Sequence, residues 1–381
     1  MPKTIYLDYN ATTPVCKEAI EASTTAMKDA WANPSSGHLA GQMARRLLEG
    51  ARRAVAGLVG AGQKQIVFTS GGTESNNLAI LGVARALEEK GRHLITSAIE
   101  HPSVLNVFKA LERQGWQVSI VPVDAEGLVQ PESFRAALRP DTTLASIMLA
   151  NNETGAIQPI AELAAIAREK GVVFHTDACQ AIGKIQVDVD RLGVDLLTLA
   201  GHKFYAPKGT GALYIRQGVQ IEPILYGAGQ EGGLRPGTEP VPQAAALGAA
   251  AEAALKGLKN GEPDRLKGLS DRLLSLLRRG WPGLLRHGPE GACLPNTLYV
   301  AFAGLDANEI LKRAPLLLAS TGAACHDRSC SISHVLAAMG VDQAAARGTI
   351  RLSVGRHTTA EEIEEAADML LTAAKQVARE A

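Results

Sequence analysis

The chain has 381 residues, of which 46% are hydrophobic and only 20% are charged. A chain of this length and apolar content can bury one large core and one smaller core, so two domains are expected. Lys plus Arg and Asp plus Glu each number 39, so the sequence lacks the net charge that favours nucleic acid or an anionic membrane surface as a partner. A small-molecule ligand is the better expectation.

The N-terminus and the cysteines indicate the compartment. The chain does not open with a basic segment followed by an apolar one, and no run approaches the roughly 18 apolar residues of a membrane span. We therefore expect a soluble, cytoplasmic protein. The cysteines are odd in number and irregularly spaced, which predicts free thiols, one of them a candidate reactive thiol. They are Cys16, Cys179, Cys293, Cys325 and Cys330.

The first 59 residues predict one strand and two helices. Residues 6–14 are typical of a short strand that ends in a turn, and residues 15–31 have helical spacing. After a break at 33–37, a second helix is expected over residues 38–59. It carries four arginines that are interpreted mainly as a solvated face, namely Arg45, Arg46, Arg52 and Arg53.

A turn of small residues follows the next strand. Residues 66–69 form the strand, and the sequence SGGT at 70–73 leads directly into an apolar helix that ends near Leu87. Free backbone N–H groups and the positive end of the helix dipole meet at such a turn, which suits a phosphate group, and Thr73 adds a hydroxyl. Small polar residues also simply cap helices. On the turn alone, both interpretations stay open.

Polar residues follow the later strands as well. These strands are expected over residues 93–97, 116–123, 143–149 and 172–176. The polar residues beyond them are His101, Asn152, Asp177 and Gln180. A carboxylate such as Asp177 at the end of a buried strand needs a cationic partner, and a pyridinium nitrogen is one. A single histidine in the position of His101 is more often a polar cap.

Lys203 lies just beyond another strand. Residues 195–200 are an apolar run of strand-forming residues, and Gly201 and His202 precede the lysine. A lysine here lies where an α/β sheet presents ligand-binding groups. Its amine can form a Schiff base with a carbonyl cofactor, above all pyridoxal 5'-phosphate (PLP), once desolvation lowers its pKa. The alternative is a surface lysine with a solvated amine.

The order of these elements predicts the fold class. Strands that alternate with helices between residues 66 and 215 indicate βαβ units and a mostly parallel sheet, so the chain is expected to be an α/β protein. Five strand ends would then converge on one crevice. They supply Thr73, His101, Asn152, Asp177, Gln180, His202 and Lys203.

The C-terminal part has a different pattern. Residues 226–239 form a Gly-rich loop that is too long for a simple connection, and Arg235 and Thr238 lie in a tight polar turn of it. An active-site or subunit-contact loop is expected there. Residues 259–263 look like a domain hinge, and the elements that follow are typical of an α+β unit. We expect a large α/β domain over 15–260 and a small α+β domain made of 1–14 and 261–381.

The small domain contains a candidate reactive thiol. Cys325 lies in a loop of small and polar residues, where His326 and Arg328 favour the thiolate. An inert surface cysteine is one alternative. A metal site made of Cys325, His326, Cys330 and His334 is another, but this spacing matches none of the usual zinc patterns, so no metal is expected.

Arg351 lies inside an apolar strand expected over residues 349–354. A lone guanidinium in such a strand is costly unless a carboxylate meets it. That carboxylate is either the α-carboxylate of a substrate or a buried Asp or Glu of the chain.

Taken together, these segments closely resemble the cysteine desulfurases and selenocysteine lyases, PLP enzymes of the aminotransferase class V fold. The resemblance runs from YLDYNATT at residues 6–13 to RLSVGRHTT at residues 351–359. Its most specific motifs are SGGTESNN, NNETG, HTDACQ, GHKFYAPKGTGALY and GAAC. Their shared order argues strongly against chance agreement.

The resemblance implies how the cofactor is bound. Lys203 would hold PLP covalently and later move the Cα proton of the substrate. Asp177 would pair with the pyridinium nitrogen, and Gln180 would form a hydrogen bond with the ring hydroxyl. His101 would stack on the ring and act as an acid and a base.

The resemblance also implies which residues bind the cofactor phosphate and the substrate carboxylate. Thr73 and His202 would bind the phosphate, together with Thr238 of the partner subunit in a homodimer. Asn152 and Arg351 would hold the carboxylate of the substrate.

The implied reaction converts L-cysteine to L-alanine. Cys325 would attack the substrate sulfur and keep it as a persulfide, for transfer to a sulfur-acceptor or scaffold protein in iron–sulfur cluster or thio-cofactor assembly. Selenocysteine lyase, which releases selenide from L-selenocysteine, is the alternative, and a sulfur carrier or metal-binding scaffold without catalysis is a third. Three departures from the common desulfurase pattern look more like the lyases: Ala200 where a serine often helps to hold the phosphate, GAACH for GSACT, and RPGTE for RSGT.

Overall fold

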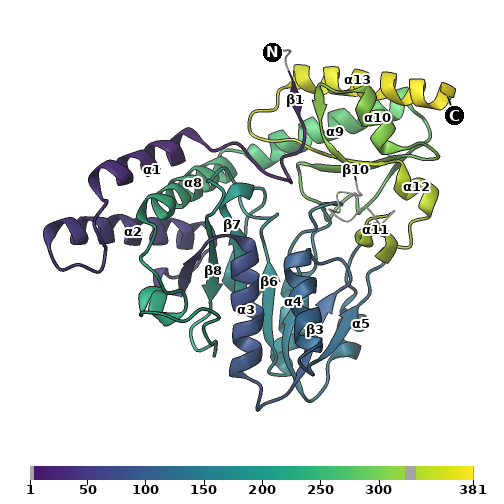
Figure 1. Cartoon of the computed structure of the whole chain (residues 1–381). Helices are drawn as coiled ribbons and strands as arrows, with labels where there is room; N and C mark the ends of the chain where they lie inside the picture. Colours follow the sequence, from purple (N-terminus) through teal and green to yellow (C-terminus); the bar gives the residue numbers. More distant parts are fainter. Residues whose placement is uncertain (1–3, 322–331, 381) are drawn as a thin grey trace.

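The computed structural model describes residues 4–321 and 332–380 (Figure 1). A large sheet with helices packed on it forms one part of the molecule, and a smaller sheet with its own helices forms the other. Helices α1 (Lys17–Asp29), α2 (Leu39–Leu58) and α8 (Val241–Lys259) lie side by side at one side of the large sheet.

The large sheet has seven strands in the order β2-β8-β7-β6-β5-β3-β4. Strand β8 is antiparallel to both of its neighbours, and all other pairs are parallel. The predicted mostly parallel sheet is therefore confirmed. The strands are β2 (Ile66–Thr69), β3 (His93–Ser97), β4 (Gln117–Val121), β5 (Thr142–Ser146), β6 (Val173–Asp177), β7 (Leu196–Ala200) and β8 (Gly211–Ile215).

Helices connect these strands and cover the sheet. Helix α4 shows how the sequence sets a boundary: its first residue is Pro102, which has no backbone N–H to leave unpaired, and His101 caps it. The helix expected to follow residues 70–73 and to end near Leu87 is confirmed as α3, which ends at Ala86. The connecting helices are α3 (Gly72–Ala86), α4 (Pro102–Glu112), α5 (Pro131–Ala137), α6 (Ile160–Glu169) and α7 (Val189–Leu192).

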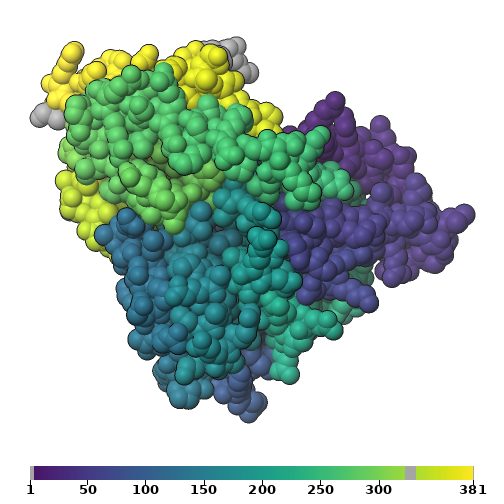
Figure 2. Space-filling view, turned by 180° about the vertical axis from the view of Figure 1, so that it is seen from behind, coloured from purple at the N-terminus to yellow at the C-terminus, as the bar shows by residue number. Residues whose placement is uncertain are grey.

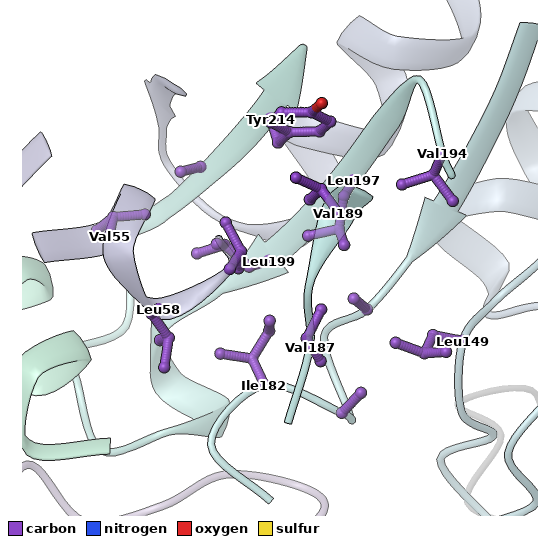
Figure 3. Close-up of a cluster of buried hydrophobic side chains, with 14 of the residues drawn as sticks. Val55, Leu58, Leu149, Ile182, Val187, Val189, Val194, Leu197, Leu199 and Tyr214 are labelled. Atoms are coloured by element: carbon purple, nitrogen blue, oxygen red, sulfur yellow. The ribbon is translucent and has the colours of Figure 1, made fainter. Parts of the chain in front are cut away.

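One face of the sheet packs against α2. Val55 and Leu58 of this helix lie beside Leu197, Leu199 and Tyr214 of β7 and β8 (Figure 3). All five side chains are buried. Burying an aliphatic or aromatic side chain of this size stabilises the fold by roughly 1.5–3 kcal/mol, so this layer fixes the position of β7 and of the loop that follows it.

The interpretation of all four α2 arginines as a solvated face is wrong for Arg52. Its guanidinium is buried, donates to both carboxylate oxygens of Glu231 at 2.6 and 2.7 Å, and lies 4.7 Å from the centre of the Phe68 ring. Glu231 also accepts a bond from the backbone N–H of Phe68 at 2.8 Å. The helical period cannot reveal a carboxylate that lies 179 positions away. The ion pair fastens the Gly-rich loop to β2.

The small sheet has four antiparallel strands in the order β12-β13-β10-β9. Its separate core includes Ile5 and Leu7 from the N-terminal segment, which explains why the first residues of the chain lie with the last. Strand β1 (Ile5–Tyr6) pairs in parallel with β11 (Leu317–Leu318). The other elements are α9 (Glu262–Gly280), β9 (Leu284–Arg286), β10 (Thr297–Phe302), α10 (Ala307–Arg313), β12 (Ser320–Thr321), α11 (His334–Ala338), α12 (Gln343–Arg347), β13 (Thr349–Ser353) and α13 (Ala360–Glu380).

The chain passes from α8 to α9 through Asn260 and Gly261. Gly261 has φ 77°, a left-handed conformation that glycine adopts without strain. The division of the chain near residues 14 and 260 into two domains stays a prediction.

Gly211 packs directly against the turn at residues 70–73. A Cβ at this position would lie 2.6 Å from the Cα of Gly71, so Gly211→Ala must displace the turn. We expect it to destabilise the protein by about 1–3 kcal/mol, as overpacked sites do. Thermal unfolding of the protein without cofactor measures this effect.

The same substitution at Gly268 is the control. A Cβ on Gly268, an exposed position within α9, meets no atom within 4 Å. Gly268→Ala should raise the melting temperature slightly, since alanine is the better helix former by roughly 0.5–1 kcal/mol. Equal melting temperatures for the two variants would contradict the close packing at Gly211.

Candidate active site

The turn between β2 and α3 has the geometry of an anion cradle. Gly71 precedes the helix with φ 148°, a conformation open to glycine, and no side chain caps the helix there. A Cβ on Gly72 would lie 2.8 Å from the Sγ of Cys179, so the backbone must approach its neighbours closely. Thr73, in the first turn, has an exposed side chain. The first N–H groups of α3 are therefore left for a ligand.

Asp177 ends β6 as a buried carboxylate. Its Oδ2 accepts a bond from Nδ2 of Asn76 at 2.7 Å, and its Oδ1 accepts one from the backbone N–H of Cys179 at 2.9 Å. These two bonds fix its orientation. Within residues 4–321 and 332–380, no Lys, Arg or His lies within 4.0 Å of it as an ion-pair partner, so the buried negative charge can accommodate a cationic group of a ligand.

His101 joins the same network. Its Nδ1 lies 3.1 Å from the backbone N–H of Ser103 and 2.8 Å from the Ser103 hydroxyl, which in turn accepts a bond from Asn76 at 2.9 Å. His101 thus does cap α4, as the simpler interpretation held. Because Nδ1 accepts the bond from Ser103, a neutral ring has its proton on Nε2. Desolvation by the surrounding protein lowers the pKa of His101, although the side chain itself still contacts solvent.

Lys203 lies in the 3-10 turn η2 (Gly201–Lys203), directly after β7. Its Nζ donates to the backbone oxygens of Asn10 and Ala11, both at 2.8 Å. Burial lowers the pKa of Lys203 to about 8. The alternative of a surface lysine with a solvated amine is therefore excluded. The lowered pKa means that the amine loses its proton more readily than an ordinary lysine does.

Two further predicted residues flank Lys203. Gln180 is buried, and its Nε2 donates to the backbone oxygen of Asn10 at 2.9 Å, the same oxygen that Lys203 contacts. Nδ1 of His202 lies 3.2 Å from the Thr12 hydroxyl. Burial, followed by the charge of Lys203, lowers the pKa of His202 to about 4, so its ring is neutral near pH 7.

Arg351 of β13 reaches the site from the small sheet. Its Nη2 donates to Oδ1 of Asp8 at 2.8 Å, and its Nη1 donates to the backbone oxygen of Asn152 at 3.0 Å. Its buried Nε has no partner among the described residues. The chain therefore supplies one carboxylate partner, and three of the five N–H donors of the guanidinium have no described hydrogen bond.

The structure does not bring all of the predicted residues together. Thr238 is exposed on the Gly-rich loop and makes no described hydrogen bond to the cradle at residues 70–73. Cys325, together with His326, Arg328 and Cys330, lies outside the described residues. His334, the fourth residue of the metal alternative, contacts the backbone oxygen of Glu100 through Nε2 at 3.0 Å.

Sequence reasoning missed three buried polar residues that hold the site together. Asn10 is 1% exposed, and Asn76 and Lys184 are buried as well. Asn10 contacts Lys203 and Gln180, while Asn76 links Asp177 to Ser103. The one signal in the sequence was an asparagine within each of two motifs, YLDYNATT and SGGTESNN.

Ala200 lies beside the cradle. Its Cβ would be 3.4 Å from a Cβ placed on Gly72, so a serine here would point a hydroxyl at the turn. Alanine leaves the cradle without that donor.

Comparison with known proteins identifies the chain's relatives. The aminotransferase class-V family model matches residues 5–365. The chain belongs to the class-V aminotransferase family. It is 45% identical over 372 residues to the cysteine desulfurase IscS of Dictyoglomus turgidum, a match that covers 97% of this chain and 94% of that protein.

Solved structures of this family agree. The structure of a NifS-like protein is similar with a TM-score of 0.91 and 36% identity over 98% of this chain and 99% of the other. A structure of SspA in complex with cysteine is similar with a TM-score of 0.82 and 37% identity over 93% of this chain and 100% of the other. The predicted class-V fold and the family resemblance are confirmed.

PLP, the cofactor of this class-V family branch, suits the residues present. The amine of Lys203 can meet an aldehyde, the unpaired carboxylate of Asp177 can meet a pyridinium nitrogen, and the uncapped start of α3 can meet a phosphate. Each of these three polar groups of the cofactor therefore has a residue or a helix end that can react with it or bind it, so the residues fit the cofactor.

No helix in the described part of the chain is long and apolar enough to cross a membrane. No cluster of three His, Cys, Asp or Glu side chains among those residues could hold a metal ion.

The lowered pKa of Lys203 makes a direct prediction. The neutral amine is the nucleophilic form, so the rate at which a small acylating reagent modifies Lys203 in the cofactor-free protein should rise with pH and reach half its maximum near pH 8. Peptide mapping by mass spectrometry measures this rate for each lysine separately, and Lys203→Ala confirms the assignment. A midpoint near 10.5 would show that burial does not shift the amine.

Proposed function

We propose that this class-V enzyme is a PLP-dependent cysteine desulfurase, which converts L-cysteine to L-alanine and transfers the sulfur to Cys325 as a persulfide. The observation that supports it most is the shared acceptor of Lys203 and Gln180, the backbone oxygen of Asn10, next to the unpaired carboxylate of Asp177. The IscS relative and the SspA complex with cysteine support cysteine as the substrate.

The cofactor is held through its three polar ends. The start of α3 with Thr73 and the neutral ring of His202 would bind the phosphate. Asp177 would pair with the pyridinium nitrogen, and Gln180 would donate to the ring hydroxyl. His101 would lie against the ring. Because Asn76 links Asp177 to the helix that His101 caps, the two groups keep a fixed relation to each other.

Bound PLP withdraws electrons from the substrate Cα and so weakens the Cβ–S bond. Arg351 and Asn152 hold the substrate carboxylate, which fixes the direction of the Cα–H bond. The amine of Lys203, whose pKa of about 8 leaves a useful neutral fraction near pH 7, takes and returns the Cα proton. His101 exchanges protons on the side of the substrate sulfur.

The sulfur transfer itself balances without an added oxidant. The thiolate of Cys325 attacks the substrate sulfur, an S–S bond forms, and the Cβ–S bond breaks. The bonding pair stays with Cβ, which takes a proton and becomes the methyl group of alanine. One cysteine and one enzyme thiol thus give one alanine and one enzyme persulfide.

The protein acts as a homodimer. Helices α1 and α2 project from one side of the molecule (Figure 2). These helices and the segment between them carry exposed apolar side chains, namely Ile20, Met27, Trp31, Leu39, Met43 and Leu47. An apolar surface of this kind is typical of a subunit contact. A homodimer also accounts for the exposure of Thr238 in a single subunit. In the dimer, Thr238 of each subunit would complete the phosphate site of the other.

The persulfide is handed on. A sulfur-acceptor or scaffold protein in iron–sulfur cluster or thio-cofactor assembly receives it, and a cytoplasmic location stays a prediction of the sequence. The small and polar residues around Cys325 predict an exposed loop, which a protein acceptor can approach.

Turnover by purified variants tests the activity. L-Cysteine should yield alanine and, with an added thiol, sulfide. Lys203→Ala should lower the rate by about a hundredfold or more and remove the visible absorbance of the bound cofactor. Cys325→Ala should lose turnover but keep the absorbance, whereas Cys293→Ala, which removes a thiol away from the site, should change neither. An active Lys203→Ala protein would disprove the proposal.

The same variants separate the desulfurase from a selenocysteine lyase. A desulfurase with Cys325→Ala should lose activity on both amino acids. Selenocysteine turnover that survives while cysteine turnover is lost would instead identify a lyase, because selenide leaves without help from a thiolate. A colourless protein that binds zinc would support a scaffold without catalysis.

Hybrid dimers test the contribution of Thr238 of the partner subunit. Lys203→Ala and Thr238→Ala subunits, each nearly inactive alone, are mixed under conditions that allow exchange. A hybrid places both defects in one site and leaves the other intact, so activity should recover to about a quarter of the wild-type value. No recovery, despite exchange shown by mass spectrometry, would place Thr238 in its own subunit's site.

A further inference from the structure

A second buried lysine lies beside Lys203. Lys184 is 6% exposed, and its Nζ donates to Oδ1 of Asn10 at 2.8 Å and to Oε1 of Gln180 at 2.7 Å. No carboxylate lies within 4.0 Å of this amine among the described residues. A buried amine without a carboxylate partner is costly, and burial lowers its pKa well below the usual value. Its two hydrogen bonds are what it contributes in return.

These bonds determine which way the amide of Gln180 faces. Charged or neutral, the amine of Lys184 offers hydrogens to Oε1. On the other side, Nε2 donates to the backbone oxygen of Asn10, which can only accept. Turning the amide over would place Oε1 against that oxygen and Nε2 against the hydrogens of Lys184. Two neighbours therefore enforce one orientation.

We propose that Lys184 is a positioning residue that presents the NH2 group of Gln180, and not its carbonyl, to the ring hydroxyl of the cofactor. This inference rests on the proposed role of Gln180. One hydrogen of Nε2 goes to Asn10, and the second remains for the ring oxygen. A carbonyl in the same place would repel the ring oxygen in its ionised form, since both would then be acceptors.

Lys184 also orients Asn10. Oδ1 of Asn10 accepts from Lys184 and, at 3.1 Å, from Asn296, while its Nδ2 donates to Thr297 at 2.9 Å. The same residue's backbone oxygen holds Lys203. The donor on Lys184 thus supports both groups that would meet the cofactor ring. Charged or titratable groups around Lys184 on adjoining elements are Tyr9, Cys179, Lys203, Tyr205, Glu262, Arg351 and Arg356.

The affinity of the cofactor-free protein for two aldehydes tests the proposal. One is PLP, and the other is 3-deoxypyridoxal 5'-phosphate, which lacks the ring hydroxyl. The dissociation constant of the deoxy analogue divided by that of PLP isolates the bond to the hydroxyl, because changes in general binding cancel in this ratio. In Lys184→Met, PLP should lose about tenfold more affinity than the deoxy analogue, as expected for one misdirected hydrogen bond.

Matched variants make the result specific. Gln180→Ala should lower the ratio by the same factor, and adding Lys184→Met to it should lower it no further. Lys208→Met removes an exposed positive charge from the loop that follows Lys203 without touching Gln180, so its ratio should equal that of the wild type. If Lys184→Met does not fold, Lys184→Gln replaces it, since its amide can donate or accept and no longer dictates an orientation.

The two ways of failing are distinguishable. A Gln180→Ala protein with an unchanged ratio removes Gln180 from the ring hydroxyl and overturns both its proposed role and this inference. A lowered ratio in Gln180→Ala with a wild-type ratio in Lys184→Met overturns only the role of Lys184. An equal loss of affinity for both aldehydes in Lys184→Met shows general destabilisation and also overturns it.

Discussion

The backbone oxygen of Asn10 is the acceptor on which the site depends. Lys203 and Gln180 donate to it at 2.8 and 2.9 Å from two different loops of the large sheet. The backbone N–H of Asn10 donates to Ser353 at 3.0 Å and its side chain to Thr297 at 2.9 Å, both in the small sheet. One buried residue of the N-terminal segment therefore links the two sheets at the point where the amine of Lys203 lies.

Burial decides the protonation of the site. It lowers the pKa of Lys203 to about 8 and that of His202 to about 4, and it raises the pKa of Glu100 to about 8. Each shift favours the neutral form of its group. The guanidinium of Arg351 is always charged, and Asp8 pairs with it. The charges that remain lie in a poorly solvated site. They therefore interact more strongly with a ligand than they would in water.

The sequence predicts some features to the residue and misses others for a physical reason. Strands at 66–69 and 93–97 are predicted with their observed ends, because buried strands are short apolar runs bounded by turns. The shared edge of parallel strands then placed their terminal polar residues together. Glu231 as a partner of Arg52 and Asn10 as a partner of Lys184 could not be found this way, since these two hydrogen bonds span 179 and 174 positions of the chain and leave no periodic signal.

Asp8 explains how Arg351, the proposed ligand of the substrate carboxylate, can lie within an apolar strand. Without Asp8, the guanidinium of Arg351 would be a buried, unpaired charge, which is severely destabilising. With every donor satisfied, it would gain little from a second carboxylate. The observed state lies between these extremes, because Nη2 meets Asp8, Nη1 meets the backbone of Asn152, and Nε remains unpaired. The other oxygen of Asp8 accepts a bond from Ser320 of β12, so the carboxylate that pairs with Arg351 also holds this neighbouring strand in place.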